Sequence, residues 1–379
     1  GLYEHIASLN VILDEVEAFR DAGADYHRVK GEALFLRATY YFWLVNLYAK
    51  PYAAGTAATD LGVPIKVRSE VEDKDFVRDP VADVYNLIVE DLLKAISDLK
   101  GIVQASVYRA NETAARALLS RVYLYMGEWE KCDSQCDTIM QATYRLQDLN
   151  TLKSGTSILS SKSTETIFSQ GEYRLNAMVG YKTKTTYAIS EDLKAAFYNQ
   201  ANDQRYKLGI TIYSYGNYPS KFKKWSNGGV SDCNLIRYAE IYLNKAEALA
   251  MQDKEEGAKN VMNSFLATRY CAEGVPDIET KTGKDLVDFI RNERRLELCF
   301  EGHRWFDLRR YSVSTKYPDV KSIRHEVRVQ STGVACGYYE LPAYPDGGWV
   351  LPIPTYELQF TDGNMVNNER PAPVYVEYE

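Results

Sequence analysis

Hydrophobic positions recur at helical spacing over much of this chain, and the strongest such stretch runs from about Glu32 to Ala49. It is apolar almost all round, which predicts a helix that is buried on every side. One stripe along it consists of Leu34, Arg37, Tyr41, Leu44 and Tyr48. A long connection follows from Lys50 to Asp79. The segment "DPVADVYNLIVEDLLKAISDL" then predicts a second helix, with Asp79 as its N-cap and Pro80 at its first position.

Two longer segments each have the pattern of a helix pair. The segment "NETAARALLSRVYLYMGEWEKCDSQCDTIM" predicts a helix that ends at Met126, a turn containing Gly127 and Trp129, and a second helix. This pattern resembles the tetratricopeptide repeat, in which two antiparallel helices interlock through small residues. The segment "LIRYAEIYLNKAEALAMQDKEEGAKNVMNSF" repeats the plan. Because the spacing between the units is irregular, we expect helix pairs separated by insertions rather than a regular array. The expected fold is mainly α, an α/α superhelix of helix pairs with insertions and minor β-hairpins.

The stretches outside these pairs are rich in loop-forming residues. The stretch from Thr143 to Asp232 is rich in Ser, Thr, Tyr and Asn, and "RYKLGITIYSYGNYPSKFKKW" predicts a β-hairpin within it. Proline and glycine are frequent after about Ser312. We expect a single domain over 1–379. Its helix-pair scaffold would cover about 1–142 and 232–311, and loop-rich, ligand-facing insertions would cover about 143–231 and 312–379.

The segment "NERRLELCFEGHRWFDLRRY" combines many charges with aromatic residues. If this segment continues a helix that begins before it, the apolar stripe of that helix would contain Leu286, Phe289, Leu296 and Phe300, with Glu293 in the middle. A carboxylate at such a position needs a partner, and we expect Arg37 or Arg237 to provide it. The residues that we expect in interhelical ion pairs are Arg37, Arg237, Glu240, Glu293, Arg294, Glu297, Glu301, Arg304 and Asp307.

We expect this charged segment to be structural rather than catalytic. His303 has no cysteine or second histidine at ligand spacing, so we expect no metal ion there. Arg309 and Arg310 would suit a phosphate group, but Glu301 and Asp307 offset their charge. The net charge of −7 also argues against nucleic acid as the main partner.

The composition adds two further points. The chain has 30 tyrosines against 12 phenylalanines, which suggests many half-buried rings with one polar end. Cys132 and Cys136 lie four residues apart on a predicted helix, a spacing that does not suit a disulfide. The other four cysteines are isolated, so we expect mostly small buried hydrophobic residues and leave open one disulfide among them.

Six blocks of the sequence resemble, in order, the SusD/RagB family of surface-exposed nutrient-binding lipoproteins of Bacteroidetes. The blocks are "YEHIASLNVILDEV", "KGEALFLRATYYFWLVNLYAKPY", "ETAARALLSRVYLYMGEWEKC", "LIRYAEIYLNKAEALA", "RNERRLELCFEGHRWFDLRRY" and "WVLPIPTYELQF". The resemblance implies a mainly helical fold with tetratricopeptide-like pairs. It also implies glycan (oligosaccharide) binding at the cell surface, as the lid and capture component of a nutrient uptake system.

The resemblance implies partners and a location as well. The family works with a SusC-like, TonB-dependent outer-membrane transporter, performs no chemical step and needs no cofactor, although some members hold a structural metal ion. Its members are exposed at the cell surface and attached to the outer membrane by an N-terminal lipid. We expect that anchor to lie outside the present sequence.

The six blocks are structural, so the ligand residues have to be inferred from chemistry. Sugars present apolar C–H faces ringed by hydroxyl groups, which suits aromatic rings that stand beside polar side chains. The predicted loops contain such candidates at Tyr52, Tyr173, Arg174, Asn176, Tyr181, Tyr215, Asn217, Tyr218 and Trp225.

Three other functions remain open from the sequence. An oligopeptide ligand would favour an extended groove over an aromatic platform. A tetratricopeptide-type interaction scaffold would have no small ligand, and the long Tyr-rich loops count against it. A glycoside hydrolase would need two carboxylates across a cleft, and the 52 acidic residues neither identify nor exclude such a pair.

Overall fold

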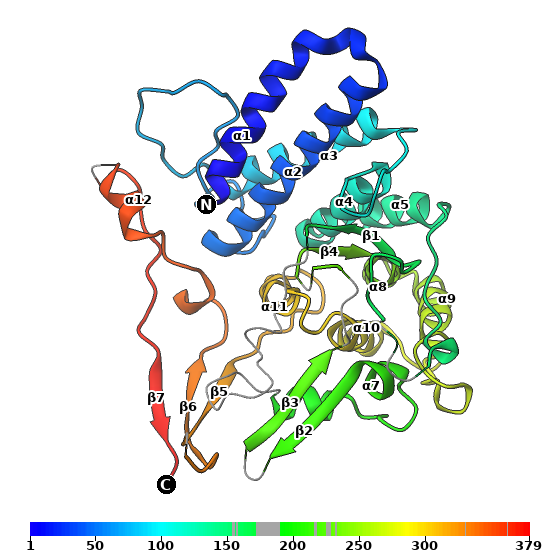
Figure 1. Ribbon diagram of the computed structural model, residues 1–379. Coiled ribbons are helices and arrows are strands. Elements are labelled where there is room, and N and C mark those ends of the chain that lie inside the picture. Colours follow the sequence, from blue (N-terminus) through cyan, green and yellow to red (C-terminus); the bar gives the residue numbers. More distant parts are fainter. Residues whose placement is uncertain are drawn as a thin grey trace. The chain divides into compact units, whose positions relative to one another are not determined.

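The computed structural model is mainly helical, which confirms the predicted fold class (Figure 1). It describes residues 1–153, 156, 158–171, 190–215, 218–224, 229–231, 233–329, 331–361 and 363–379, with the backbone alone for 209–215 and 218–224. The helices are α1 (Leu2–Glu15), α2 (Ala24–Tyr48), α3 (Val81–Leu99), α4 (Glu112–Met126), α5 (Trp129–Met140), α6 (Glu191–Ala196), α7 (Gln204–Gly209), α8 (Tyr238–Met251), α9 (Glu255–Leu266), α10 (Gly283–Glu297), α11 (Arg304–Ser312) and α12 (Thr355–Gln359). The strands are β1 (Thr166–Ser169), β2 (Ile210–Tyr215), β3 (Tyr218–Lys224), β4 (Leu235–Arg237), β5 (Ile323–Arg328), β6 (Ala335–Leu341) and β7 (Val374–Glu377).

The chain forms two compact units, each assembled from separate stretches of sequence. The first contains Gly1–Glu128, Leu308–Ile323 and Leu341–Pro373, and the second contains Trp129–Asp307, Arg324–Glu340 and Val374–Glu379. This division differs from the predicted one into a helical scaffold and ligand-facing insertions. The predicted division concerns function, and it stays a prediction.

The first unit is built around α2. Helices α1, α2 and α3 lie side by side in it, and α4 packs on α3 (Figure 1). Phe35, Ala38 and Tyr41 of α2 have no exposed surface, which confirms the predicted burial of this helix. The helix starts before the predicted position, at Ala24. The prediction missed its first turns because they expose Asp25 and His27 and so lack the all-round apolar pattern.

The start of α3 differs slightly from the prediction. Pro80 is the N-cap and Val81 the first helical residue, so the prediction that Asp79 caps the helix was wrong. The Asp79 carboxylate instead accepts a hydrogen bond of 2.6 Å from the backbone N–H of Ile65. It therefore holds the preceding loop rather than the helix end.

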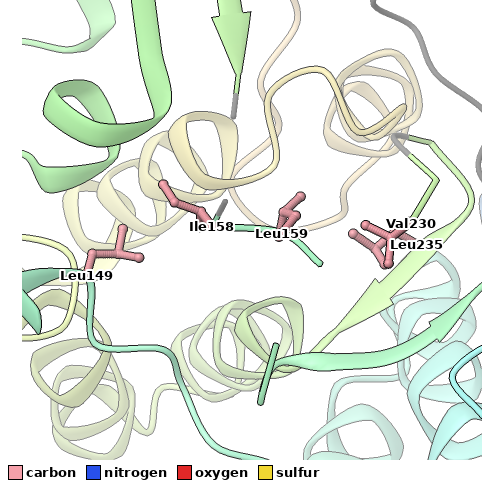
Figure 2. Packing of buried hydrophobic residues seen from close by; sticks show 5 residues of the cluster. All are labelled: Leu149, Ile158, Leu159, Val230 and Leu235. Atoms are coloured by element: carbon pink, nitrogen blue, oxygen red, sulfur yellow. The ribbon is translucent and has the colours of Figure 1, made fainter. Parts of the chain in front are cut away.

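In the second unit, α5, α9 and α10 each pack against α8, and α8 with α9 is one of the helix pairs that the sequence predicts. A separate apolar cluster forms between β4 and the segments that precede β1 and β4 in the sequence (Figure 2). It consists of Leu149, Ile158, Leu159, Val230 and Leu235. Parts of the predicted insertion therefore contribute to the core of this unit.

Small sheets accompany these helices. The pairs β1–β4, β2–β3 and β6–β7 are antiparallel, and β5 adjoins the other side of β6. In the second pair Ile210 lies opposite Lys224 and Tyr215 opposite Tyr218. This arrangement confirms the predicted β-hairpin.

Helix α10 carries the first half of the charged segment and ends at Glu297. Leu286 and Leu296 are fully buried as expected, whereas Phe289 is only half-buried. Phe300 lies beyond the helix end, with a positive φ of 60°. The predicted stripe was therefore wrong at Phe300, because the helical period does not continue to that residue.

All six cysteines are free thiols, so none of the distant ones forms a disulfide. Cys132, Cys136 and Cys299 are buried, in agreement with the expected small hydrophobic role. None of the described helices combines the length and the apolar character needed to cross a membrane.

Candidate functional site

The structure describes the surroundings of one predicted ligand residue, Tyr52. Tyr215 and Tyr218 lie opposite each other in the β2–β3 hairpin, where the backbone alone is described. Tyr173, Arg174, Asn176, Tyr181, Asn217 and Trp225 lie outside the described residues. Their role in ligand binding, like that of Tyr52, stays a prediction.

Tyr52 follows directly after α2, on a short extended segment of the first unit. Ala49 is extended, with φ −122° and ψ 166°, and a residue before proline, such as Lys50, also favours extended backbone. Side chains alternate between the two sides of such a segment. Pro51 is buried, while Lys50 is exposed and Tyr52 is half-buried.

An aromatic contact supports the Tyr52 side chain. Its ring centroid lies 4.9 Å from that of Tyr85 in α3, at an interplanar angle of 60°. Tyr85 is itself buried, and its hydroxyl group donates to the side-chain oxygen of Asn46 at 3.2 Å. Tyr52 thus packs against a residue that is connected to the last turn of α2.

The last carbonyl groups of α2 are satisfied by segments far away in the sequence. We call the carbonyls of Asn46, Leu47, Tyr48 and Ala49 the α2 end. Helix ends leave such carbonyls without intrahelical partners. Arg309 donates to two of them, those of Asn46 and Ala49. The backbone N–H of Leu351 donates to Leu47 at 3.0 Å.

The carbonyl of Tyr48 has two donors, Arg78 at 2.9 Å and the Asn368 amide at 2.7 Å. Asn368 also donates to the carbonyl of Leu351 at 2.7 Å and accepts from Arg78 at 2.8 Å. The remaining donors of Arg78 bind the carbonyls of Leu61, Gly62 and Val366. The segment that carries Lys50 and Tyr52 therefore starts from a firmly held point.

Arg309 is fully buried without a carboxylate partner among the described residues. Burial therefore lowers the pKa of its guanidinium group to about 10, so the group remains charged at neutral pH. A cation at the C-terminal end of a helix interacts favourably with the helix dipole. We conclude that Arg309 caps α2 and is a structural residue.

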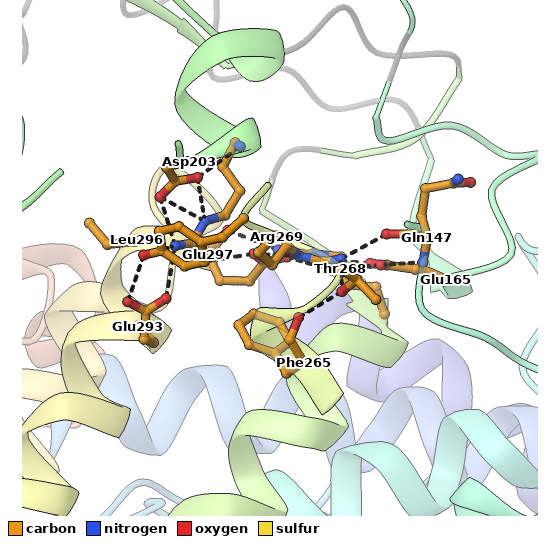
Figure 3. Close-up of polar contacts among 12 residues, drawn as sticks. Gln147, Glu165, Asp203, Phe265, Thr268, Arg269, Glu293, Leu296 and Glu297 are labelled. Atoms are coloured by element: carbon orange, nitrogen blue, oxygen red, sulfur yellow. Dashed lines mark hydrogen bonds and ion pairs between the residues drawn. The ribbon is translucent and has the colours of Figure 1, made fainter. Parts of the chain in front are cut away.

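The second unit contains a different kind of polar core, shown in part in Figure 3. The arginine–carboxylate network consists of Arg205, Arg237, Arg269, Glu165, Asp203, Glu293, Glu297 and Glu301. Arg269 donates to Glu165 at 2.7 Å and to Glu297 at 3.0 Å. Arg237 donates to Glu297 at 2.6 Å and to Glu301 at 2.8 Å. The network joins loop, strand and helix segments.

The partner of Glu293 is not the expected one. Its carboxylate accepts hydrogen bonds from Arg205 at 2.8 Å and from the Tyr270 hydroxyl group at 2.9 Å. Arg37 instead binds both oxygens of Asp91 at 2.8 Å, and the donors of Arg237 bind other acceptors. The expectation that Arg37 or Arg237 pairs with Glu293 was wrong, because a position on an apolar face does not reveal which helices meet.

The other residues expected in ion pairs lie in or beside α8, α10 and α11. Arg294 donates to Asp307 at 2.9 Å and lies 3.8 Å from Glu240. Arg304 is half-buried at the start of α11. Within the described residues, no three His, Cys, Asp or Glu side chains gather in a way that would hold a metal ion.

The network contains five carboxylates and three guanidinium groups, and its carboxylates differ in their pKa. Burial raises the pKa of Glu293, and this effect exceeds the attraction of Arg205. Burial also acts on Glu297, but Arg269, Arg237 and Arg205 hold its pKa well below the usual range. Glu293 is therefore the carboxylate of this pair that binds a proton more readily.

Several of these residues were not expected from the sequence. Arg78, Asn368, Glu165 and Arg269 lie in or beside loops, where hydrophobic periodicity gives no indication of burial. Arg205 lies in a short helix next to the predicted hairpin. For the arginines and Glu165 the available signal was charge alone, which does not distinguish a buried charged residue from an exposed one, and Asn368 offers not even that signal.

Comparison with known proteins covers nearly the whole chain. A family model described as "SusD family" matches residues 122–373, and one described as "Starch-binding associating with outer membrane" matches residues 1–124. SusD-like protein P2 of Formosa agariphila is 22% identical over an alignment 422 residues long, which covers 97% of this chain and 78% of that protein. SusD-like protein P38 of the same organism is 39% identical over an alignment 97 residues long, which covers 24% of this chain and 19% of that protein.

Solved structures show the same fold. A protein of Bacteroides vulgatus that has been proposed to bind sugar superimposes with a TM-score of 0.78 at 25% identity, over 97% of this chain and 83% of that one. A SusD superfamily protein of Bacteroides thetaiotaomicron gives a TM-score of 0.76 at 24% identity, over 97% and 84% of the two chains.

Proposed function

Because the chain belongs to the SusD family, we propose that it binds oligosaccharides at the cell surface, as the lid and capture component of a TonB-dependent uptake system of the outer membrane. The observation that carries this proposal is the match of two family models over residues 1–124 and 122–373, one of them described by starch binding and outer-membrane association. The similarity to a solved protein proposed to bind sugar supports it.

The proposal includes a transporter and an anchor. A SusC-like transporter would receive the captured oligosaccharide, and a lipid on a segment outside the present sequence would hold the protein at the membrane surface. Both follow from family membership. The chain covers 78% of the length of SusD-like protein P2.

Glu293 and Glu297 of the arginine–carboxylate network do not have the environment of a hydrolytic pair. A glycoside hydrolase needs two carboxyl groups that face the substrate across a cleft. The side chains of Glu293 and Glu297 are exposed by 0% and 4%, and both are bound to arginines. They have the buried, paired environment of structural groups. From membership of the SusD family we propose that this protein releases no sugar.

Calorimetric titration with neutral oligosaccharides, alongside a peptide pool, tests the proposed function. We expect saturable binding of at least one glycan, no reducing sugar released on incubation, and weaker binding by Tyr52→Ala. Tyr356→Ala, which removes an exposed tyrosine of α12, is the matched control. Heat from the peptide pool alone would establish the oligopeptide function instead, and sugar release would overturn the binding-only proposal.

A further inference from the structure

The strands β5, β6 and β7 form a three-stranded sheet with β6 in the centre (Figure 1). Nearly all of this sheet belongs to the second unit. Every residue of β7 is exposed, and Gly337 is the one buried residue of β6. Side chains alternate between the two faces of a strand, so both faces of the β6–β7 pair reach the surface and can be compared.

Two tyrosines stand side by side on one of these faces. Tyr339 of β6 lies directly opposite Tyr375 of β7, and Glu377 lies opposite Gly337 on the same face. The ring centroids of the two tyrosines are 5.4 Å apart. The two residues are exposed by 42% and 40%, and Glu377 is exposed as well. We call Tyr339, Tyr375 and Glu377 the tyrosine face.

The Tyr375 side chain is held in place at its phenol end. Its hydroxyl group donates to the carbonyl of Cys336 at 2.9 Å. A Cβ on Gly337 would come within 2.6 Å of the ring carbon Cζ of Tyr375, so the phenol end of the ring lies directly over this glycine. A ring that is supported in this way loses little conformational freedom when a ligand packs against it.

The aromatic and charged groups of the opposite face contact one another. The Arg324 guanidinium group lies 4.5 Å from the ring centroid of Tyr338, and its Nε donates to Glu340 at 3.2 Å. The ring centroids of Tyr338 and Tyr378 are 5.7 Å apart. The Tyr378 hydroxyl group donates to Glu326 at 3.4 Å. A ligand would therefore have to displace existing contacts on this face.

The polar groups of the tyrosine face have no such contacts. Among the described residues, neither the Tyr339 hydroxyl group nor the Glu377 carboxylate has a hydrogen-bond or ion-pair partner. A phenol donates and accepts, and a carboxylate accepts. Aromatic rings beside such groups suit the apolar C–H face of a sugar and the hydroxyl groups around it.

We propose that the tyrosine face binds a sugar ring of a neutral oligosaccharide. The sugar packs on the rings of Tyr339 and Tyr375, while its hydroxyl groups bond to the Tyr339 phenol and donate to Glu377. This inference rests on the proposed function and adds to it a location and a class of ligand.

The charges of the sheet select the ligand class. The three strands contain two arginines, Arg324 and Arg328, and no lysine. Both arginines belong to the opposite face, where Arg328 pairs with Glu326. The carboxylate of Glu377 therefore faces the ligand without a neighbouring arginine or lysine from these strands. It repels carboxylate and sulfate groups, so the face favours neutral sugars over uronic acids and sulfated sugars.

The simpler interpretation is a cross-strand aromatic pair that only stabilises the sheet. Tyr339→Phe and Glu377→Gln separate the two interpretations, because each keeps the shape of the side chain and changes only its polar group. Tyr339→Ala and Tyr375→Ala remove the rings themselves. The matched controls are Tyr378→Ala and Tyr378→Phe, which change a tyrosine that is exposed by 45% on the opposite face.

Each variant is titrated calorimetrically with maltoheptaose, cellohexaose, xylohexaose and hexagalacturonate. His325 alternates with Arg324 and so belongs to the tyrosine face, and a buffer of about pH 8 keeps histidine side chains neutral. For a neutral oligosaccharide that binds the unmodified protein, we expect each alanine variant of the tyrosine face to lose affinity by at least about tenfold.

The conservative variants should have smaller effects. Tyr339→Phe and Glu377→Gln should each lose affinity by about threefold to tenfold, as for single hydrogen bonds. Their thermal midpoints should stay close to that of the unmodified protein, and both Tyr378 variants should bind normally.

Four results would overturn the inference. Normal affinity of all variants of the tyrosine face would reject this site and leave the proposed function intact. An equal loss for Tyr378→Ala would show an effect of the whole sheet rather than of one face. Tighter binding of hexagalacturonate than of every neutral ligand would reject the neutral class. Binding of none of the four would count against the proposed function itself and remove the basis of the site.

Discussion

The arginine–carboxylate network of the second unit and the α2 end of the first unit bury arginine in different ways. In the second unit, Arg205, Arg237 and Arg269 face carboxylates at hydrogen-bond distance. In the first unit, Arg78 and Arg309 bind carbonyl groups and, for Arg78, one side-chain amide. The carboxylates raise the pKa of the first three guanidinium groups in spite of burial. Without such partners, burial lowers the pKa of Arg78 and Arg309.

This difference shows which groups are left behind when an arginine is lost. Removing an arginine from the network leaves negative charges in a dry interior, which is very unfavourable. Removing one from the α2 end leaves carbonyl dipoles, which cost much less to leave unpaired. Burial alone therefore does not rank these residues; the charge of the partner does.

The largest effect should come from Arg237→Met. The variant leaves Glu297 and Glu301 without their shared partner, and we expect the free energy of unfolding to fall by about 3–5 kcal/mol. Urea denaturation followed by circular dichroism measures it. Arg20→Met is the control, since Arg20 and its partner Glu17 lie near the surface. A loss below about 1 kcal/mol for Arg237→Met would contradict the comparison.

Arg309→Met should have a smaller effect. It leaves the carbonyls of Asn46 and Ala49 without donors, but it leaves no buried charge behind. We expect a loss of about 1–3 kcal/mol, measured in the same way. A loss equal to that of Arg237→Met would mean that the identity of the partner does not matter, and the distinction between the network and the α2 end would fail.

The smallest effect, and one that depends on pH, is expected for Glu293→Gln. The raised pKa of Glu293 means that the folded protein keeps a proton which the unfolded chain loses above the usual value of 4.5. Folding stability should therefore fall as the pH rises through the raised folded pKa. Glutamine cannot titrate, so the stability of the variant relative to the unmodified protein should increase over this interval.

Thermal midpoints between pH 4 and pH 8 measure this dependence. Glu297 provides the contrast: its lowered pKa gives stability that is present above 4.5 and lost as the pH falls towards the folded pKa. A difference between Glu293→Gln and the unmodified protein that stays constant, or decreases, as the pH rises would contradict the assignment of a raised pKa to Glu293.

The parts of the fold that could be predicted are those with local causes. The buried pattern around Phe35 and Tyr41 predicts α2, and the segment from Arg205 to Trp225 predicts the hairpin. The partners of Glu293 and of the α2 end could not be predicted, because they depend on which distant segments meet. Of the candidate ligand residues, Tyr52 could be placed in its surroundings.

The α2 end also imposes an order on the synthesis of the protein. Helix α2 is made early, yet the groups that complete it include Arg309, Leu351 and Asn368, which are made near the end. At about 5–20 residues per second, tens of seconds at most separate the two events. During this time the nascent first unit lacks its final contacts. A chain that stops before Leu351 should therefore be more sensitive to proteolysis around residues 46–52 than the full chain.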